Sequence, residues 1–411
     1  MAIFKEHKVS VVDLLNVIPE ALLSHLSQTT TVDYYSKILH GKKMFYLLMY
    51  GILESDRLSQ RTLEEIFNDS VFKMLFNLEQ DESVRRSSLS ERLSKIDPDY
   101  FRQIYEHIYD QFSGCYLKAE QQQYNIVRVD STIISDTSGK IVEGLDYQNN
   151  SGSSKKAVKY SMAFDGILPC DSKVFTESTY SSEDMALPEI VRSHVKQQAG
   201  HRNMYVLDRG LQSARNMRDF SEDNIPFIAR VKENRKYVEL ESNLSTETDL
   251  GELTLIVDSK VQLYTNIATK NKQGKTSNKY ELVKQPFRLI VVKSKDDIDT
   301  EYWFVTNDFE LSAKQICDYY KRRWDIEVFF RFIKQELHTS HLISLNQNGI
   351  QVMLYMTLIV AMLVLIYKRA NNIGYKTAKR RFKMEIRDLI IALIVIQCGG
   401  DPTLFFKTKK E

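Results

Sequence analysis

Hydrophobic residues recur at helical spacing over the first part of the chain. The pattern is clearest in Met44–Leu53, Leu63–Leu78 and Tyr100–Phe112, where apolar positions return every three or four residues. Arg85–Leu93 is typical of a capped helix with arginines on its flanks. We therefore predict a helical domain over residues 1–122. This pattern alone fits a DNA-binding domain and a plain helical bundle equally well.

Short apolar runs of strand length begin after Tyr124. They predict strands over Ile126–Asp130, Lys159–Phe164, Ser172–Phe175, Met204–Asp208 and Phe227–Val231, with helices over Ser182–Gln197 and Gly210–Phe220. Strands that first follow one another and then alternate with helices predict an α/β domain, a mixed sheet covered by helices. We place its first part over residues 123–232. The stretch Asn149–Lys156, rich in Ser and Asn, is predicted to be an exposed loop.

A β-rich insertion is predicted over residues 233–307, with no helix. Its expected strands are Leu253–Val257, Tyr280–Val283, Phe287–Lys293 and Tyr302–Thr306. Helical periodicity returns at Ser312, which forms a capping-box pattern with Gln315. We assign residues 308–400 to the second part of the α/β domain and residues 401–411 to a tail.

The segment Ile350–Tyr367 is almost wholly apolar, with Gln351 and Thr357 as its only polar residues. Its length is near the roughly 20 residues that span a bilayer. The alternative is a buried core helix, which we favour because the segments on both sides continue one soluble domain. Asp13 and Glu20 interrupt the apolar stretch near the N-terminus, so we expect no signal peptide and no membrane partner.

Composition refines this picture only slightly. A chain of 411 residues predicts two or three domains, and a net charge of +2 does not by itself indicate a polyanionic partner. Two local basic clusters can still bind phosphates, although solvated surfaces explain them equally well. They are Arg230, Lys232, Arg235 and Lys236, and Lys376, Lys379, Arg380, Arg381 and Lys383.

The four cysteines lie far apart and have no zinc-binding spacing. They are Cys115, Cys170, Cys317 and Cys398. We predict reduced thiols in a protein of the cytoplasm.

Tyr320–Leu337 carries the most informative pattern. On a single helix, one carboxylate, three cations and a phenol share a stripe: Tyr320, Arg323, Glu327, Arg331 and Lys334. A separate apolar face is formed by Ile326, Phe329, Phe330, Ile333 and Leu337. Such a stripe is either a surface salt-bridge ladder or a metal ligand beside phosphate-binding cations.

Two aspartates favour the metal interpretation. Asp130 and Asp208 each end a predicted strand after an apolar run, where an unpaired buried carboxylate is costly. Neighbouring ends of parallel strands are where ligand sites collect. Together with Glu327 they predict a site of hard oxygen ligands for Mg²⁺ or Mn²⁺, two ions in all.

These residues resemble a known family. Tyr320, Arg323, Glu327 and Lys334 match the Tyr-x2-Arg-x3-Glu-x6-Lys pattern of bacterial insertion-sequence transposases with an Asp-Asp-Glu site, the insertion-sequence-four family. Val129–Thr132 resembles the first-Asp motif of that family, and Leu207–Gly210 resembles the second. The resemblance covers residues 30 to 400.

The resemblance implies a ribonuclease-H-like catalytic fold with a β-rich insertion and makes the α/β domain the catalytic one. It implies that Tyr320, Arg323 and Lys334 contact DNA near the cleaved end. It also implies that an aromatic residue of the insertion, Tyr302 or Trp303, stacks on a flipped base. Further candidates for phosphate contact are Arg209 and, less strongly, Lys159.

The combined hypothesis is a cut-and-paste DNA transposase, in which Asp130, Asp208 and Glu327 hold two Mg²⁺ or Mn²⁺ ions. Its expected partners are transposon-end DNA, target DNA and a second protomer in a synaptic complex, with the N-terminal domain recognising inverted repeats. It would act in the bacterial cytosol, associated with the nucleoid. The alternatives are a DNA-binding protein that no longer cuts, a membrane-anchored protein, and a metal-dependent nuclease without strand transfer.

Overall fold

The computed structural model describes residues 9–405, apart from residues 117–123, 137, 142, 149–153, 199–201, 244–245, 271–275 and 298–299. The predicted boundary between residues 122 and 123 lies outside this part, as do the first five residues of the predicted loop Asn149–Lys156. Residues 154–156 already belong to a strand.

Seven helices make up the described part of residues 9–116. They are α1 (Val11–Leu15), α2 (Glu20–Thr29), α3 (Gly41–Glu54), α4 (Gln60–Asn68), α5 (Ser70–Leu75), α6 (Arg86–Lys95) and α7 (Pro98–Tyr116). The helical prediction is confirmed, with two differences. The predicted helix Leu63–Leu78 is broken, because Asp69 is extended and its side chain caps α5 by accepting from the Val71 amide at 2.9 Å. Arg85 forms no side-chain cap for α6; Glu64 accepts from the Arg86 amide instead, at 3.0 Å.

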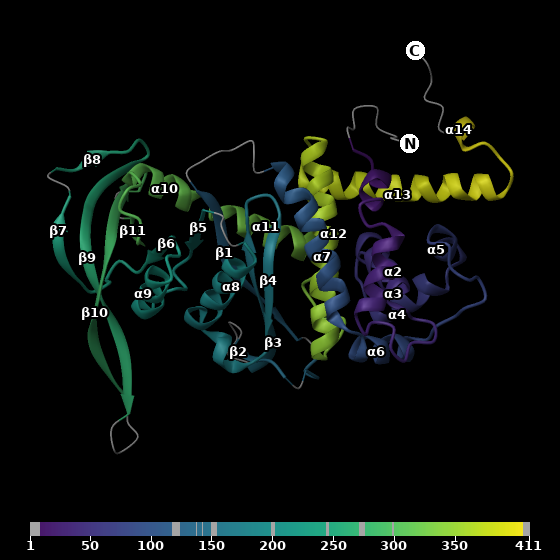
Figure 1. The fold of residues 1–411 in the computed structure, drawn as a ribbon, viewed down its shortest axis with the longest axis horizontal. Helices are drawn as coiled ribbons and strands as arrows, with labels where there is room; N and C mark the ends of the chain where they lie inside the picture. Colours follow the sequence, from purple (N-terminus) through teal and green to yellow (C-terminus); the bar gives the residue numbers. More distant parts are fainter. Residues whose placement is uncertain are drawn as a thin grey trace, which may run out of the picture.

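The central sheet is mixed. Its first strands are β1 (Asn125–Ser135), β2 (Leu145–Gln148), β3 (Ser154–Phe164), β4 (Pro169–Phe175), β5 (Asn203–Leu207) and β6 (Phe227–Val231). β3 lies antiparallel between β4 and β1, whereas β1, β5 and β6 run parallel. This order, with helices on both faces, is the ribonuclease-H-like fold that the resemblance implies (Figure 1).

The β-rich segment extends this sheet. It contains β7 (Tyr237–Ser242), β8 (Thr248–Asp249), β9 (Leu253–Lys270), β10 (Thr276–Ser294) and β11 (Glu301–Thr306). β11 pairs with β6, so the insertion continues the sheet at one end of the molecule (Figure 1). Two predicted strands, Tyr280–Val283 and Phe287–Lys293, are one strand, β10, whose pairing shifts register between Leu282 and Pro286.

Helices cover the sheet on both faces. Alternate residues of β1, β5 and β6 pack with α10 (Ala313–Lys321), and the intervening ones join the core that includes α8 (Glu183–Gln197) and α9 (Ala214–Glu222). α9 begins at Ala214, not at Gly210 as predicted, because Ser213 is its N-cap and accepts from the Asn216 amide.

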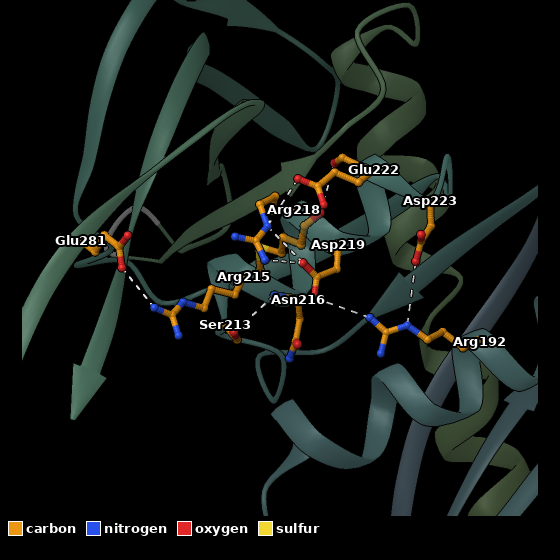
Figure 2. Close-up of polar contacts among 11 residues, drawn as sticks. Arg192, Ser213, Arg215, Asn216, Arg218, Asp219, Glu222, Asp223 and Glu281 are labelled. Carbon is orange, nitrogen blue, oxygen red and sulfur yellow. Dashed lines mark hydrogen bonds and ion pairs between the residues drawn. The ribbon is translucent and has the colours of Figure 1, made fainter. Parts of the chain in front are cut away.

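The exposed face of α9 is charged, and its arginines are paired (Figure 2). Arg215 reaches Glu281 of β10 at 3.0 Å, and Arg218 contacts Asp219 at 2.7 Å. Arg192 of α8 lies 3.7 Å from Asp219. These pairs connect α8, α9 and the insertion, and because they are exposed each adds only about 0–1 kcal/mol.

The remaining helices are α11 (Trp324–Glu336), α12 (Gln347–Ala370), α13 (Tyr375–Gln397) and α14 (Pro402–Phe405). α12 lies against α7 and also contacts α3, α6 and α13 (Figure 1). It is the one helix in the described chain long and apolar enough to cross a membrane, and 89% of that apolar window is buried in the protein. The prediction of a buried core helix for Ile350–Tyr367 is therefore confirmed.

Candidate active site

Asp130 lies inside β1, not at its end as predicted. β1 pairs in parallel with β5 up to Val129 opposite Leu207, and Asp130 and Asp208 come directly after this last pair. β1 then continues to Ser135 because its other edge stays paired with β3, where Asp130 lies opposite Met162. The two aspartates thus leave neighbouring parallel strands at the same level of the sheet.

The turn after Asp208 passes close to α8. A β-carbon on Gly210 would lie 2.7 Å from the Cβ and Cγ atoms of Glu183, closer than side-chain contacts allow. Glycine at this position therefore lets the Asp208 turn approach Glu183. This contact gives the Asp208-Arg209-Gly210 sequence a steric reason.

Glu327 lies on α11, whose apolar residues face the core as predicted. The predicted single helix Tyr320–Leu337 is interrupted, however, because α10 ends at Lys321 and α11 begins at Trp324. At the break, the amides of Asp325 and Ile326 bond carbonyls three residues back, on Arg322 and Arg323. Tyr320 is therefore on α10, and Glu327 is in the first turn of α11.

The three carboxylates converge on the guanidinium of Arg323. Its Nη1 lies 3.4 Å from Asp130 Oδ2 and 4.0 Å from Asp208 Oδ2, and its Nη2 donates to Glu327 Oε1. The Arg323 side chain is only 11% exposed. Three acids from β1, the end of β5 and α11 thus share one cation, so the structure brings together the three predicted carboxylates and adds Arg323 between them.

Tyr320 completes this group. Its hydroxyl donates to Asp208 Oδ1 at 3.1 Å. Burial and the neighbouring Asp208 raise its pKa, so the hydroxyl keeps its proton and stays a donor. Its ring packs on Phe304, with 4.7 Å between the centroids. Tyr320 therefore holds Asp208 in the described structure, and its contact with DNA stays a prediction.

Burial raises the pKa of the Asp130 carboxyl to about 7, and the nearby Asp208 and Glu183 add to this rise. The Ser131 amide, which donates to Asp130 Oδ1 at 2.7 Å, and the charge of Arg323 oppose it. A carboxyl with a raised pKa is partly protonated near neutral pH, and a divalent metal ion that binds it displaces this proton.

The donor set fits a hard divalent cation. Aspartate and glutamate oxygens are the ligands that Mg²⁺ and Mn²⁺ prefer, and all three side chains are partly exposed. In the described part of the chain, no three acids, histidines or cysteines are close enough to hold an ion as they stand. Since the guanidinium of Arg323 lies between the carboxylates, an ion bound there would compete with it.

A polar network that sequence reasoning missed lies beside Asp130. Ser131 Oγ donates to Glu183 Oε2 at 2.7 Å, and Lys159 Nζ donates to Glu183 Oε1 at 2.9 Å. Lys159 is completely buried, so the suggestion that it contacts phosphate is wrong. A lysine within the apolar run of β3 was the available signal, because such a charge needs a buried partner.

Two predicted phosphate contacts are close in sequence to the carboxylates: Arg209 follows Asp208, and Lys334 lies on the same helix as Glu327. Arg209 is exposed, and Lys334 of α11 is half-buried, with its pKa lowered by burial. Neither forms an ion pair with any residue that the structure describes. The predicted basic clusters are less available: Arg235 donates to the carbonyls of Gln212 and Tyr264, and Lys383 pairs with Glu54 at 3.2 Å.

A cleft of about 630 Å³ opens beside this centre, between α10 and the insertion. Its wall includes Tyr302, Tyr320 and Arg323. Arg230 lies 4.7 Å from the centre of the Tyr302 ring. Trp303 is on the opposite face of β11, where its Nε1 donates to Glu301 at 3.0 Å and its ring meets Tyr237. Of the two aromatic candidates, only Tyr302 therefore faces the cleft.

The chain is similar to transposases. Residues 121–363, more than half of the chain, match the family model described as a transposase DDE domain. A transposase for insertion sequence element IS4SA from Synechocystis sp. is 25% identical over 343 residues, which cover 83% of this chain and 85% of the relative. A transposase for insertion sequence element IS5377 from Geobacillus stearothermophilus is 27% identical over 57% of this chain and 55% of the relative. A cryo-EM structure of a piggyBac transposase synaptic complex with hairpin DNA gives a TM-score of 0.46 and 11% identity, covering 96% of this chain and 83% of that one.

Proposed function

The chain belongs to the transposase DDE domain family, and from this premise we propose that it cuts the ends of an insertion sequence and joins them to target DNA by a cut-and-paste route. Asp130, Asp208 and Glu327 carry the reaction. The observation that supports this most directly is their convergence on Arg323 from three separate elements. This arrangement differs from a surface ladder because the Arg323 side chain is largely buried and the Asp130 carboxyl loses hydration.

The three carboxylates would hold two Mg²⁺ or Mn²⁺ ions. When bound, such ions activate water or a 3′-hydroxyl and stabilise the leaving oxygen of the phosphodiester. Water attacks one strand at the end of the element and frees a 3′-hydroxyl, which is the next nucleophile. Tyr320 keeps Asp208 oriented, and Arg323 balances the charge of the acids. Lys334 and Arg209 would contact backbone phosphates.

The cleft between α10 and the insertion suits an extruded base. Tyr302 presents its ring there, beside the cation of Arg230. Stacking of a base on an aromatic ring contributes about 1–3 kcal/mol. We assign the stacking role to Tyr302, because Trp303 faces away from the cleft.

The proposed partners follow from this reaction. They are transposon-end and target double-stranded DNA, and a second protomer in the synaptic complex. The N-terminal helices would recognise the inverted repeats. The place of action would be the bacterial cytosol, associated with the nucleoid.

Cleavage of a linear DNA carrying the ends that flank the gene tests the proposal. Wild type is compared with Asp208→Ala and Glu327→Gln, with and without Mg²⁺ or Mn²⁺. We expect metal-dependent breaks at the ends from wild type only, while both variants still bind the DNA. Glu336→Gln, which removes an acid elsewhere on α11, is the matched control and should cut normally.

The same reactions separate the alternative functions. Joined products with target DNA distinguish a transposase from a nuclease without strand transfer. If wild type binds the ends but never cuts with either metal, the protein is a DNA-binding remnant. Cleavage by Glu327→Gln at the wild-type rate would remove Glu327 from the centre.

A further inference from the structure

Arg128 lies two residues before Asp130 on β1, so both side chains point to the same face of the sheet. Its side chain is only 6% exposed. Within the described chain it pairs with Asp325, whose Oδ2 lies 2.7 Å from Nη2. An arginine this deeply buried needs every donor directed at a partner, because desolvation of the charge is costly.

Three further N–H groups of Arg128 bond main-chain carbonyls. Nε donates to Arg322 at 3.1 Å, and Nη1 donates to Ile126 at 2.6 Å and to Asp165 at 2.8 Å. One guanidinium therefore connects β1, the turn after β3 and the break between α10 and α11. These are the elements that place Asp130 on one side and Arg323 with Glu327 on the other.

One of these bonds lies at the break between α10 and α11. In an unbroken helix, the carbonyl of Arg322 would accept from the amide of Ile326, four residues on. Here the Ile326 amide bonds the carbonyl of Arg323, and the carbonyl of Arg322 accepts from both the Asp325 amide and Arg128 Nε. Asp325, the other partner of Arg128, stands two residues before Glu327.

Gly166 leaves room for this guanidinium. A β-carbon at this position would lie 2.6 Å from Arg128 Nη1 and 2.9 Å from Cζ. Its φ of +102° is also a backbone conformation that other residues rarely adopt. The turn after β3 is thus shaped around Arg128.

We propose that Arg128 is a positioning residue for the three-carboxylate centre: it holds the start of α11 against β1 and thereby sets the separation of Glu327 from Asp130. This inference rests on the proposed function, because that separation matters only if the acids act on a shared cation. A lysine at this position keeps the charge but cannot direct donors at four acceptors, since its ammonium is a single point.

The test measures Mn²⁺ binding to the full-length protein without DNA, by isothermal titration calorimetry. We expect Arg128→Lys to weaken Mn²⁺ binding about tenfold or more, the range seen when supporting partners of metal ligands are changed. The Mg²⁺ concentration for half-maximal cleavage should rise in parallel. Affinity for end DNA without metal should stay unchanged, because Arg128 is buried.

Arg288→Lys is the matched control for stability. Arg288 is buried in the insertion, pairs with Asp258 at 2.7 Å and donates to the carbonyl of Leu311, so it loses a comparable set of bonds. We expect a similar fall in Tm without a change in Mn²⁺ affinity. Equal weakening of Mn²⁺ binding by both variants would overturn the inference, because general destabilisation would then explain it.

Asp325→Asn provides a second variant that should fold, since its side chain is 46% exposed. We expect it to weaken Mn²⁺ binding in the same direction as Arg128→Lys but less, and Glu336→Gln to leave it unchanged as a control for lost charge on α11. Wild-type Mn²⁺ affinity in both Arg128→Lys and Asp325→Asn would overturn this inference but not the proposed function. Failure of wild type itself to bind Mn²⁺ would overturn the proposed function and this inference with it.

Discussion

Asp130 shows how a single residue can serve the site at the expense of stability. Burial raises its pKa to about 7, whereas an aspartate in an unfolded chain has a pKa of about 3.9. The folded protein therefore binds this proton more tightly than the unfolded chain does. The stabilising contribution is full below about pH 4 and is lost as the pH rises through about 7.

Asp130→Asn should consequently be inactive yet more stable than wild type at high pH. At pH 8 we expect the free energy of unfolding to rise by roughly 1–4 kcal/mol, at about 1.36 kcal/mol for each unit of pKa shift. Near pH 4 the two proteins should be equally stable. Urea unfolding followed by circular dichroism at both pH values measures the difference. Asp318→Asn, at an exposed position of α10, is the control and should show no such pH dependence. If Asp130→Asn raised the free energy of unfolding equally at both pH values, the argument from the Asp130 pKa would be contradicted.

Tyr302 and Trp303 are adjacent residues with opposite orientations, which allows a matched comparison. Tyr302→Ala should remove the benefit of the extruded base, about 1–3 kcal/mol, whereas Trp303→Ala should not. The measurement is the affinity for end DNA with an intact or an abasic nucleotide at successive positions around the cleavage site. Only Tyr302→Ala should make the protein indifferent to the missing base. Loss of this discrimination in Trp303→Ala alone would assign the role to Trp303.

At the level of elements, hydrophobic periodicity predicted most of the strands and the buried helix α12. It did not predict the break between α10 and α11, where the carbonyl of Arg322 accepts from Arg128, almost two hundred residues away in the chain. Local patterns carry no information about such a partner. The same limit applies to the site: motif spacing grouped Asp130, Asp208 and Glu327, but nothing local indicated that Arg323 would lie between them.

A buried and an exposed position in α12 and α13 test what holds these helices in place. Leu358 of α12 is completely buried, whereas Ile394 near the end of α13 is 38% exposed. Leu358→Ala should reduce the free energy of unfolding by about 2–5 kcal/mol, and Ile394→Ala should change it by less than about 0.5 kcal/mol. Chemical denaturation compares the two variants. Equal small losses would mean that α12 does not pack in the core.

On the scale of the whole molecule, the net charge of +2 does not show which cations are paired or buried and which can bind DNA. The arginines on the exposed face of α9 are neutralised by neighbouring acids (Figure 2), and Arg128 and Lys159 are buried. Arg209, which follows Asp208, and Lys334, on the helix that carries Glu327, form no ion pair with the residues that the structure describes. DNA affinity should therefore depend on a few local cations and not on the overall charge.

The variant Lys334→Gln tests whether DNA affinity depends on this local cation. If Lys334 contacts one phosphate, its loss should reduce the steepness of log Kd against log salt by about 0.9 and weaken binding to all sequences alike. Fluorescence anisotropy with end DNA and with unrelated DNA, over a range of KCl concentrations, measures both effects. Lys173→Gln, whose lysine pairs with Glu189 at 3.3 Å, is the matched control and should keep the wild-type slope. An unchanged slope in Lys334→Gln would show that this lysine does not contact the DNA backbone.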